Sequence, residues 1–197
     1  MRLSKEQAAR NRQSIIDAAA RLFRERGIDG VGVADLMKAA GFTHGGFYNH
    51  FPSKEALAAE ACTAAFEGII GEITARMEAG PPGSAFWQYL EEYLAPEHRD
   101  DPNGGCPTAS LAVDAWRQGE QVQGAYADGI EGVLAIFAAQ LSKSSSGKKR
   151  DVTAARERAV RLLSEIVGAV VLARAVVGSN PALSDEILQS SREKLGT

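Results

Sequence analysis

The segment from Gly41 to Glu55 constrains the fold more than any other part of this 197-residue chain. It reads GFTHGGFYNHFPSKE and follows an apolar helical stretch over Val33–Ala40. Glycine takes up the backbone of a tight turn easily, so Gly41 predicts a turn between two short helices. The second helix is rich in small and aromatic residues. This layout is typical of a helix-turn-helix, whose second helix enters the major groove of DNA.

The helical pattern extends to both sides of this segment. Apolar residues make up 45% of the chain and only seven residues are proline, while no strand-like alternation of useful length occurs. The sequence therefore predicts an all-α protein. We expect about nine helices, near residues 5–26, 33–40, 44–50, 54–79, 85–94, 107–118, 120–142, 154–178 and 183–195.

Individual residues predict where several of these helices begin and end. Gly27 suits the left-handed position that follows a helix. Ser53 and Ser84 are placed to cap the helices that they precede, and Pro107 fits a first helical turn. Between the helices, the polar stretch 96–105 predicts a loop and the stretch 143–150 predicts a mobile linker.

The charge distribution supports a division into two domains. We expect a helix-turn-helix domain over residues 1–53 and a second helical domain over residues 54–197. The chain carries a net charge of −3, yet residues 1–26 hold seven lysines and arginines against three acidic residues. A basic surface of this kind would attract DNA phosphates. Ordinary solvated charge on a helix would give the same count, so both interpretations stay open.

The few cysteines and histidines argue against a disulfide framework and a metal site. Two cysteines, Cys62 and Cys106, cannot form a disulfide framework, and three histidines lack partners at metal-ligand spacing. No apolar run is long enough to span a membrane, and the first residues do not form a secretory signal. We therefore expect a cytoplasmic protein with no metal site, no cofactor and no membrane contact.

Residues 8 to about 60 resemble the amino-terminal domain of the TetR family of bacterial transcriptional regulators. The matching stretches are IIDAA at 15–19, LF at 22–23, Gly27, VADL at 33–36, AAG at 39–41, FYNHF at 47–51 and SKEAL at 53–57. The resemblance implies a homodimer that binds a palindromic operator in double-stranded DNA. It implies a repressor that leaves its operator when a small-molecule inducer binds, although an activator of the same fold remains open.

The resemblance also indicates which residues contact DNA. Eight residues are expected to do so: Thr43, His44, Gly45, Gly46, Tyr48, Asn49, His50 and Lys54. Thr43 is placed to cap the third helix with its hydroxyl, and the Tyr48 hydroxyl can reach a phosphate. The chain departs from the family at Gly46, where a hydroxyl is frequent, and at Gly32, where Ser or Thr usually caps the second helix. The alternative for residues 33–51 is a helical corner with no contact to DNA.

The second domain offers candidates for dimer formation and for ligand binding. The helix at 154–178 is apolar over more than one face, so it must bury one face inside the protomer and another against a partner. The expected interface residues are Leu163, Ile166, Val167, Val170, Ile187 and Leu188, unless both helices are interior to a monomer. The expected pocket residues are Phe66, Tyr89, Cys106, Trp116 and Tyr126, although such aromatic residues more often belong to a core.

Cys106 is the one residue with potential covalent chemistry. It precedes Pro107 at a predicted helix start, where the helix dipole favours a thiolate, and a glycine pair before it could leave it accessible. It is either a sensor of electrophiles and oxidants or a buried capping residue. An enzyme using Cys106 and His98 is disfavoured because no third orienting group is evident. No catalytic residue is therefore assigned, and an architectural DNA-binding protein is the remaining rival function.

Overall fold

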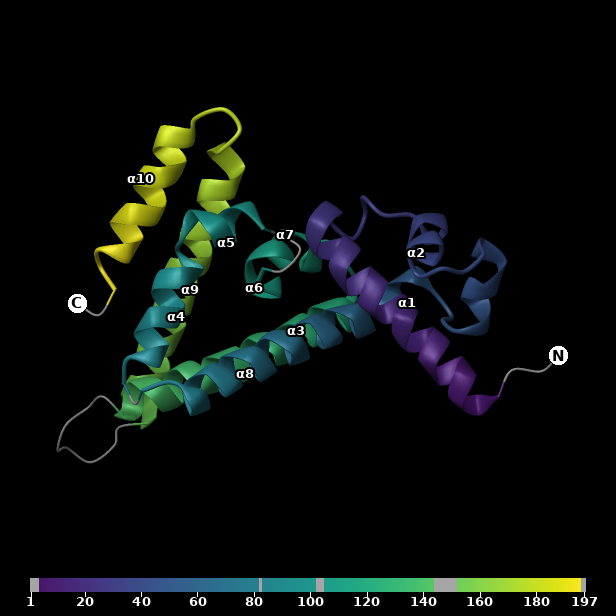
Figure 1. Ribbon diagram of the computed structural model, residues 1–197, viewed down its shortest axis with the longest axis horizontal. Coiled ribbons are helices and arrows are strands. Elements are labelled where there is room, and N and C mark those ends of the chain that lie inside the picture. The colour runs from purple at the N-terminus through teal and green to yellow at the C-terminus, as the bar shows by residue number, and fades with distance from the viewer. Residues whose placement is uncertain (1–3, 82, 102–104, 144–151, 196–197) are drawn as a thin grey trace. The chain divides into compact units, whose positions relative to one another are not determined.

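The computed structural model describes residues 4–81, 83–101, 105–143 and 152–195, and these residues form helices and connecting turns with no strand (Figure 1). This confirms the predicted all-α fold. The elements are α1 (Lys5–Arg26), α2 (Val33–Ala39), the 3-10 helix η1 (His44–Asn49), α3 (Lys54–Ala79), α4 (Ala85–Tyr93), α5 (Pro96–Asp100), α6 (Pro107–Ser110), α7 (Ala112–Ala115), α8 (Glu120–Lys143), α9 (Val152–Val176) and α10 (Pro181–Arg192). None of these helices is both long and apolar enough to cross a membrane. The predicted linker at 143–150 lies, after Lys143, outside the described residues.

Contacts between residues divide the chain into two compact units. The first unit comprises residues 1–67 and 106–129, and the second comprises residues 68–105 and 130–197. Helices α3 and α8 each contribute residues to both units. The domain boundary expected after residue 53 stays a prediction.

The first unit is built around the apolar face of α1. Its buried residues recur at the spacing of one helix face and include Ile15, Ala19, Leu22 and Phe23. Leu36 and Met37 of α2 and Phe47 of η1 complete this core. The exposed side chains of η1 therefore stand on a packed base.

The helix ends in this unit follow the sequence closely. Gly27 has a φ of 75° and its N–H donates to the carbonyl of Phe23, so it ends α1 as expected. The Ser53 hydroxyl accepts a hydrogen bond from the N–H of Ala56 at 3.0 Å and caps α3. Gly32 gives α2 no side-chain cap, also as expected.

Two predicted caps are wrong. The Thr43 side chain makes no capping hydrogen bond to η1, because only its backbone carbonyl accepts, from the N–H of Gly46. The Ser84 hydroxyl donates to the carbonyl of Pro81 in the preceding turn and does not cap α4. At Thr43 the backbone carbonyl already accepts from the N–H of Gly46. At Ser84 the hydroxyl is already bonded to the carbonyl of Pro81.

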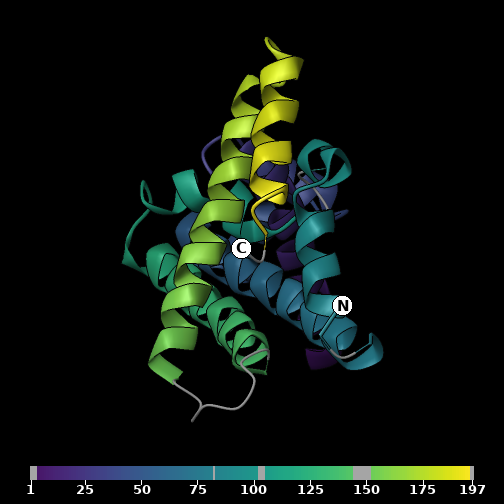
Figure 2. The same cartoon turned by 90° about the vertical axis from the view of Figure 1, so that its left-hand side faces the viewer.

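Aromatic packing and a helical hairpin form the second unit. Phe86 and Tyr89 of α4 meet Phe137 of α8 edge to face, with ring centroids 5.1 and 6.4 Å apart. Helices α9 and α10 lie side by side, as both views show (Figures 1 and 2). The Asn180 side chain caps α10, and Pro181 occupies its first turn.

Two predictions between α4 and α8 are wrong. The expected polar loop at 96–105 contains the helix α5, with Pro96 in its first turn and Arg99 buried. The expected single helix at 107–118 is split into α6 and α7 at Leu111, whose ψ is −3° and whose side chain is buried. Tertiary burial of these short turns overrides their polar or helical sequence pattern.

Candidate functional site

The exposed side of η1 is polar and its inner side is aromatic. Phe47 and Phe51 are buried, with ring centroids 5.7 Å apart, so they anchor the segment to the core. Tyr48 stands edge-on to Phe47 and is 69% exposed. Of the expected DNA-contacting residues, the exposed ones are Thr43, His44, Gly45, Tyr48 and Asn49, and the half-buried ones are Gly46, His50 and Lys54. The structure therefore places all eight within η1, directly beside its two ends, or at the start of α3.

The glycine pair in η1 is not required by the fold. Neither Gly45 nor Gly46 has a positive φ. A Cβ atom on Gly45 would meet nothing within 4 Å, and one on Gly46 would lie 3.5 Å from Cε of Met37, an ordinary contact. A methyl group would therefore fit at both positions, and Gly45 also has open space beyond it. Gly45 leaves the backbone of η1 uncovered on its exposed side, whereas Gly46 is half-buried against Met37.

Unpaired cations border this segment. Lys54 begins the 26-residue helix α3, and Lys38 lies in the last turn of α2. Neither side chain makes an ion pair within the described parts of the chain. A lysine at a helix amino terminus adds its charge to the helix dipole and suits a phosphate. Lys38 is not among the DNA-contacting residues expected from the sequence, because nothing in the sequence distinguishes it from an ordinary exposed helix residue.

Much of the basic charge on α1 is already compensated. Arg12 pairs with Glu60 of α3 and lies 4.5 Å above the ring of Phe51. Arg21 and Arg26 both reach Glu25. The excess of basic residues in the amino-terminal sequence therefore overstates the positive charge that α1 presents to a ligand.

Three of the five expected pocket residues belong to one cluster in the first unit. The ring of Phe66 packs edge-on against Tyr126, with centroids 5.4 Å apart. The Tyr126 hydroxyl donates to the carbonyl of Thr108 at 2.7 Å, and Sγ of Cys106 donates to the Thr108 hydroxyl at 2.9 Å. Burial raises the pKa of Tyr126, and it raises the pKa of the nearby Cys62 thiol to about 11.

The other two expected pocket residues lie elsewhere. Trp116 is 68% exposed at the end of α7, with the guanidinium of Arg117 5.3 Å from its ring. Tyr89 belongs to the second unit and packs against Phe137. A ligand pocket formed by these residues stays a prediction.

Cys106 is less accessible than its sequence context suggests. Only 2% of the residue is exposed, and the helix that follows it is a single turn. A buried thiol held by Thr108 agrees with the structural interpretation, while the sensor interpretation now requires α6 to open first. The sensor role stays a prediction.

Four of the six expected interface residues fill the interior of the second unit. These are Leu163, Ile166, Val170 and Leu188, whereas Val167 and Ile187 are half-buried. The large apolar side chains that α9 and α10 expose are instead Val152, Val160, Leu172 and Leu183. Sequence periodicity identified an apolar helix, but it did not distinguish the inward face from the outward one.

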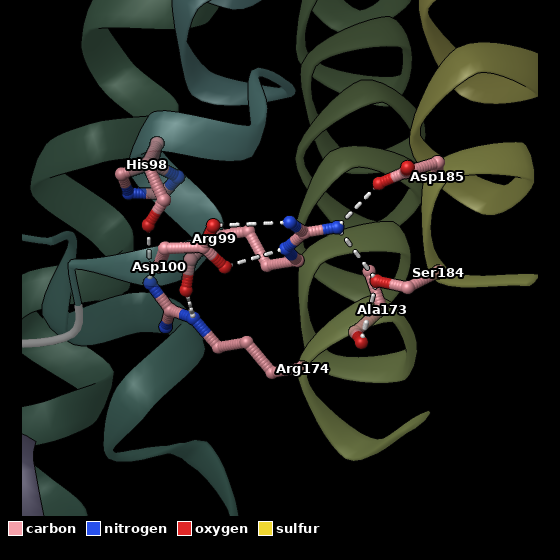
Figure 3. A network of polar contacts seen from close by, with 7 residues as sticks. All are labelled: His98, Arg99, Asp100, Ala173, Arg174, Ser184 and Asp185. Atoms are coloured by element: carbon pink, nitrogen blue, oxygen red, sulfur yellow. Dashed lines mark hydrogen bonds and ion pairs between the residues drawn. The ribbon is translucent and has the colours of Figure 1, made fainter. Parts of the chain in front are cut away.

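A buried arginine network ties α5 to α9 and α10 (Figure 3). Arg99 is 8% exposed and donates to both carboxylate oxygens of Asp100, to Asp185 at 2.6 Å and to the Ser184 hydroxyl at 2.9 Å. Arg174 donates to the backbone carbonyls of His98 and Arg99. The hydrogen bonds from Arg99 lower the pKa of Asp100 below its ordinary value. Nothing in the sequence pairs Arg99 with residues some 85 positions away.

Comparison with known proteins places this geometry in a family. The family model for bacterial regulatory proteins of the tetR family matches residues 15–61. The regulator LmrA of Bacillus subtilis is 27% identical over 175 residues, which are 88% of this chain and 91% of the relative. A TetR-family regulator from Cytophaga hutchinsonii superposes with a TM-score of 0.76 at 26% identity, over 98% of this chain and 96% of that one. Residues 15–61 form a TetR-family DNA-binding domain. The chain is thus a helix-turn-helix transcriptional regulator, as its sequence predicts.

Further TetR-family relatives share parts of the chain or its fold. The regulator AcrR of Shigella flexneri is 38% identical over 82 residues, 42% of this chain and 38% of the relative. The reduced form of Escherichia coli NemR has the same fold, with a TM-score of 0.77 at 21% identity and 95% coverage of both chains. The TetR model covers all eight expected DNA-contacting residues, whereas the expected interface residues lie outside it.

Proposed function

We propose that this chain is a repressor that binds a palindromic DNA operator as a homodimer in the bacterial cytoplasm and leaves it when a small-molecule inducer binds. The observation that carries this proposal is the exposed polar side of η1 beside the start of α3, within the region that the family model matches. The relatives NemR of Escherichia coli and DhaR of a Mycobacterium species are named transcriptional repressors. That naming favours a repressor over an activator.

In this proposal the two ends of the exposed segment have different roles. Residues 43–46 approach the base edges, and the uncovered backbone at Gly45 permits a closer approach than a side chain would. Tyr48, Lys54 and the first N–H groups of α3 bind phosphates, which positions the segment without reading sequence. The protein then reads few bases per subunit, and a dimer on two half-sites compensates for this.

The first unit contains a physical connection between the buried cluster and the loop after α1. The Asp114 carboxylate of α7 accepts a hydrogen bond from the N–H of Ile28, and burial raises the pKa of Asp114 despite that bond. The Gln118 side chain donates to Asp29 at 3.1 Å. Because α6 in turn bonds to Tyr126 through Thr108, a ligand that displaces Tyr126 would move α6 and α7 and strain the end of α1. A tilt of α3, which begins at Lys54, would then change the distance between the two reading segments, which are residues 43–49 of each subunit.

The homodimer in this proposal forms through α9 and α10. Val160, Leu172 and Leu183 are exposed, and the half-buried Val167 and Ile187 extend the apolar surface on these helices. Two helices from each subunit would form a four-helix interface. Replacing Leu172 by Asp should shift the protein toward monomer in sedimentation equilibrium, whereas Leu172→Met should leave the dimer intact.

Operator binding tests the central proposal. Selection of bound fragments from a random duplex pool would supply the operator, and its affinity would then be measured across a salt series. Lys54→Gln should weaken binding and reduce the slope of log affinity against log salt by about 1, because one phosphate contact is lost. Arg156→Gln removes the same charge from an exposed pair in the second unit and serves as the control. Unchanged affinity and slope in Lys54→Gln and in Tyr48→Ala would refute the assignment of this surface.

A further inference from the structure

A pocket on the second unit collects positive charge above an apolar floor. The pocket has a volume of about 250 Å³. Trp87 of α4, Leu141 of α8 and Leu162 of α9 contribute its apolar side chains. Arg158, Arg161, Glu165 and the C-terminal Lys194 contribute its charged ones. No part of this pocket belongs to the DNA-contacting surface or to the Tyr126 cluster.

Helix geometry explains why α9 supplies four of these residues. Positions 158, 161, 162 and 165 follow the i, i+3, i+4, i+7 spacing that places side chains on one helix face. Trp87 lies opposite that face and packs edge-on against Phe86 at 5.3 Å, which restrains its ring. Leu141 is buried, while Trp87 and Leu162 remain half-buried. The floor therefore offers apolar surface that is partly open to a ligand.

The two arginines of the pocket differ from other arginines of the same unit. Arg76 pairs with Glu72 and Glu92, and Arg99 pairs with Asp100 and Asp185. Arg156 also has a partner, Glu131.

Arg158 and Arg161 lie less than two helical turns after Arg156 on α9. Neither makes an ion pair or a hydrogen bond with any described residue. Two guanidinium groups on one helix face repel each other, and a bound anion would relieve that repulsion.

We propose that this pocket binds a small organic carboxylate with an apolar body. The carboxylate accepts hydrogen bonds from the guanidinium groups of Arg158 and Arg161, which match it in a bidentate geometry. The apolar body lies on Trp87 and Leu162. The volume is below the range of drug-sized sites, so it admits a short alkyl or single-ring carboxylate. The Glu165 carboxylate repels the bound anion and so weakens its binding.

Tryptophan fluorescence gives a direct measurement of this binding. The chain has two tryptophans, so a Trp116→Phe background leaves Trp87 as the sole reporter. Octanoate should change the Trp87 emission saturably, and octanol, which has the same alkyl body but no charge, should bind at least about tenfold more weakly. Equal affinity for octanol, or no saturable change with octanoate, would overturn the proposal.

Charge variants locate the anion. The double variant Arg158→Gln/Arg161→Gln should weaken octanoate binding by at least about tenfold. The double variant Arg10→Gln/Arg21→Gln removes the same charge from exposed positions on α1 and should bind octanoate as the wild type does. Glu165→Gln should tighten binding severalfold, a gain that a structural role for Glu165 would not produce.

Two results would contradict the location or the nature of the occupant. If the Arg158→Gln/Arg161→Gln variant bound octanoate as tightly as the wild type does, the anion would lie elsewhere. A change of sedimentation coefficient in that variant, without a change in octanoate affinity, would assign the two arginines to a contact between copies of the chain. Because none of these measurements involves DNA, they can fail without affecting the proposed operator binding.

Discussion

Gly129 provides the sharpest test of packing in the first unit. A Cβ atom at this position of α8 would lie 2.2, 2.3 and 2.6 Å from three ring carbons of Phe66. Real Cβ atoms do not approach other atoms this closely, and Phe66 is itself buried against Tyr126. Gly129→Ala must therefore displace the Phe66 ring or bend α8.

The magnitude follows from a matched glycine on the same helix. A Cβ atom on Gly124 would meet nothing within 4 Å, so Gly124→Ala should gain about 0.8–1 kcal/mol of unfolding free energy from helix propensity alone. Gly129→Ala gains the same amount but loses about 1–3 kcal/mol to overpacking. The two alanine variants should thus differ in unfolding free energy by about 1–3 kcal/mol.

Urea unfolding followed by far-ultraviolet circular dichroism, at one protein concentration, measures this difference. Phe66→Leu serves as the partner substitution, because a smaller side chain makes room for the new methyl group. The double variant Phe66→Leu/Gly129→Ala should be more stable than the sum of the single effects by at least about 0.5 kcal/mol. Equal stability of the Gly124 and Gly129 variants, or a coupling energy of zero, would refute the described packing of Phe66 on α8.

Three further predictions concern other parts of the molecule. Arg99→Gln removes a buried guanidinium with several partners and should cost about 2–3 kcal/mol of unfolding free energy, whereas Arg156→Gln, from an exposed pair, should cost about 0–1 kcal/mol. Burial lowers the pKa of His98 below its ordinary value of 6.5, so the native state binds fewer protons than the unfolded state just below that pH. The contribution of His98 to stability should be constant above this value and fall as the pH drops below it, and His98→Gln should reduce that fall in urea titrations across the range. Gly45→Ala should raise the unfolding free energy by about 0.5–1 kcal/mol and weaken operator binding in the same preparation.

Each of these has a contradicting outcome. Equal losses in the two arginine variants would mean that the Arg99 network does not stabilise the fold. A pH dependence that is identical in wild type and His98→Gln would assign the acid sensitivity to other groups. Unchanged operator affinity in Gly45→Ala would mean that the uncovered backbone does not approach DNA.

The sequence predicted those helix ends and helix starts that depend only on neighbouring residues. Gly27 ends α1 and Ser53 caps α3 because their partners lie within the adjacent turn. The long helices α3 and α8 also begin at the expected residues, since continuous apolar and helix-forming stretches define them. The polar surface of η1 was equally accessible to prediction, because the motif that carries it is local.

Features that depend on distant residues could not be predicted. The polar stretch around Arg99 reads as a loop until Ser184 and Asp185 are brought beside it. The division of the segment after Pro107 depends on burying Leu111, which no local rule requires. Likewise, Leu163 and Leu172 are equally apolar, and only the tertiary structure assigns one to the interior and the other to the surface.

The glycine pair in η1 has a consequence for how such a regulator can change. Backbone conformation and packing leave position 45 open to other residues and leave room for at least a methyl group at position 46, so many substitutions at position 45 should still allow the chain to fold. New side chains could be introduced at the tip of the reading segment while the buried Phe47 and Phe51 hold its base unchanged. Under the proposed function, operator preference can therefore change at position 45 while the fold is retained. A library restricted to this position should lose few folded variants, so its members can be screened for operator preference directly.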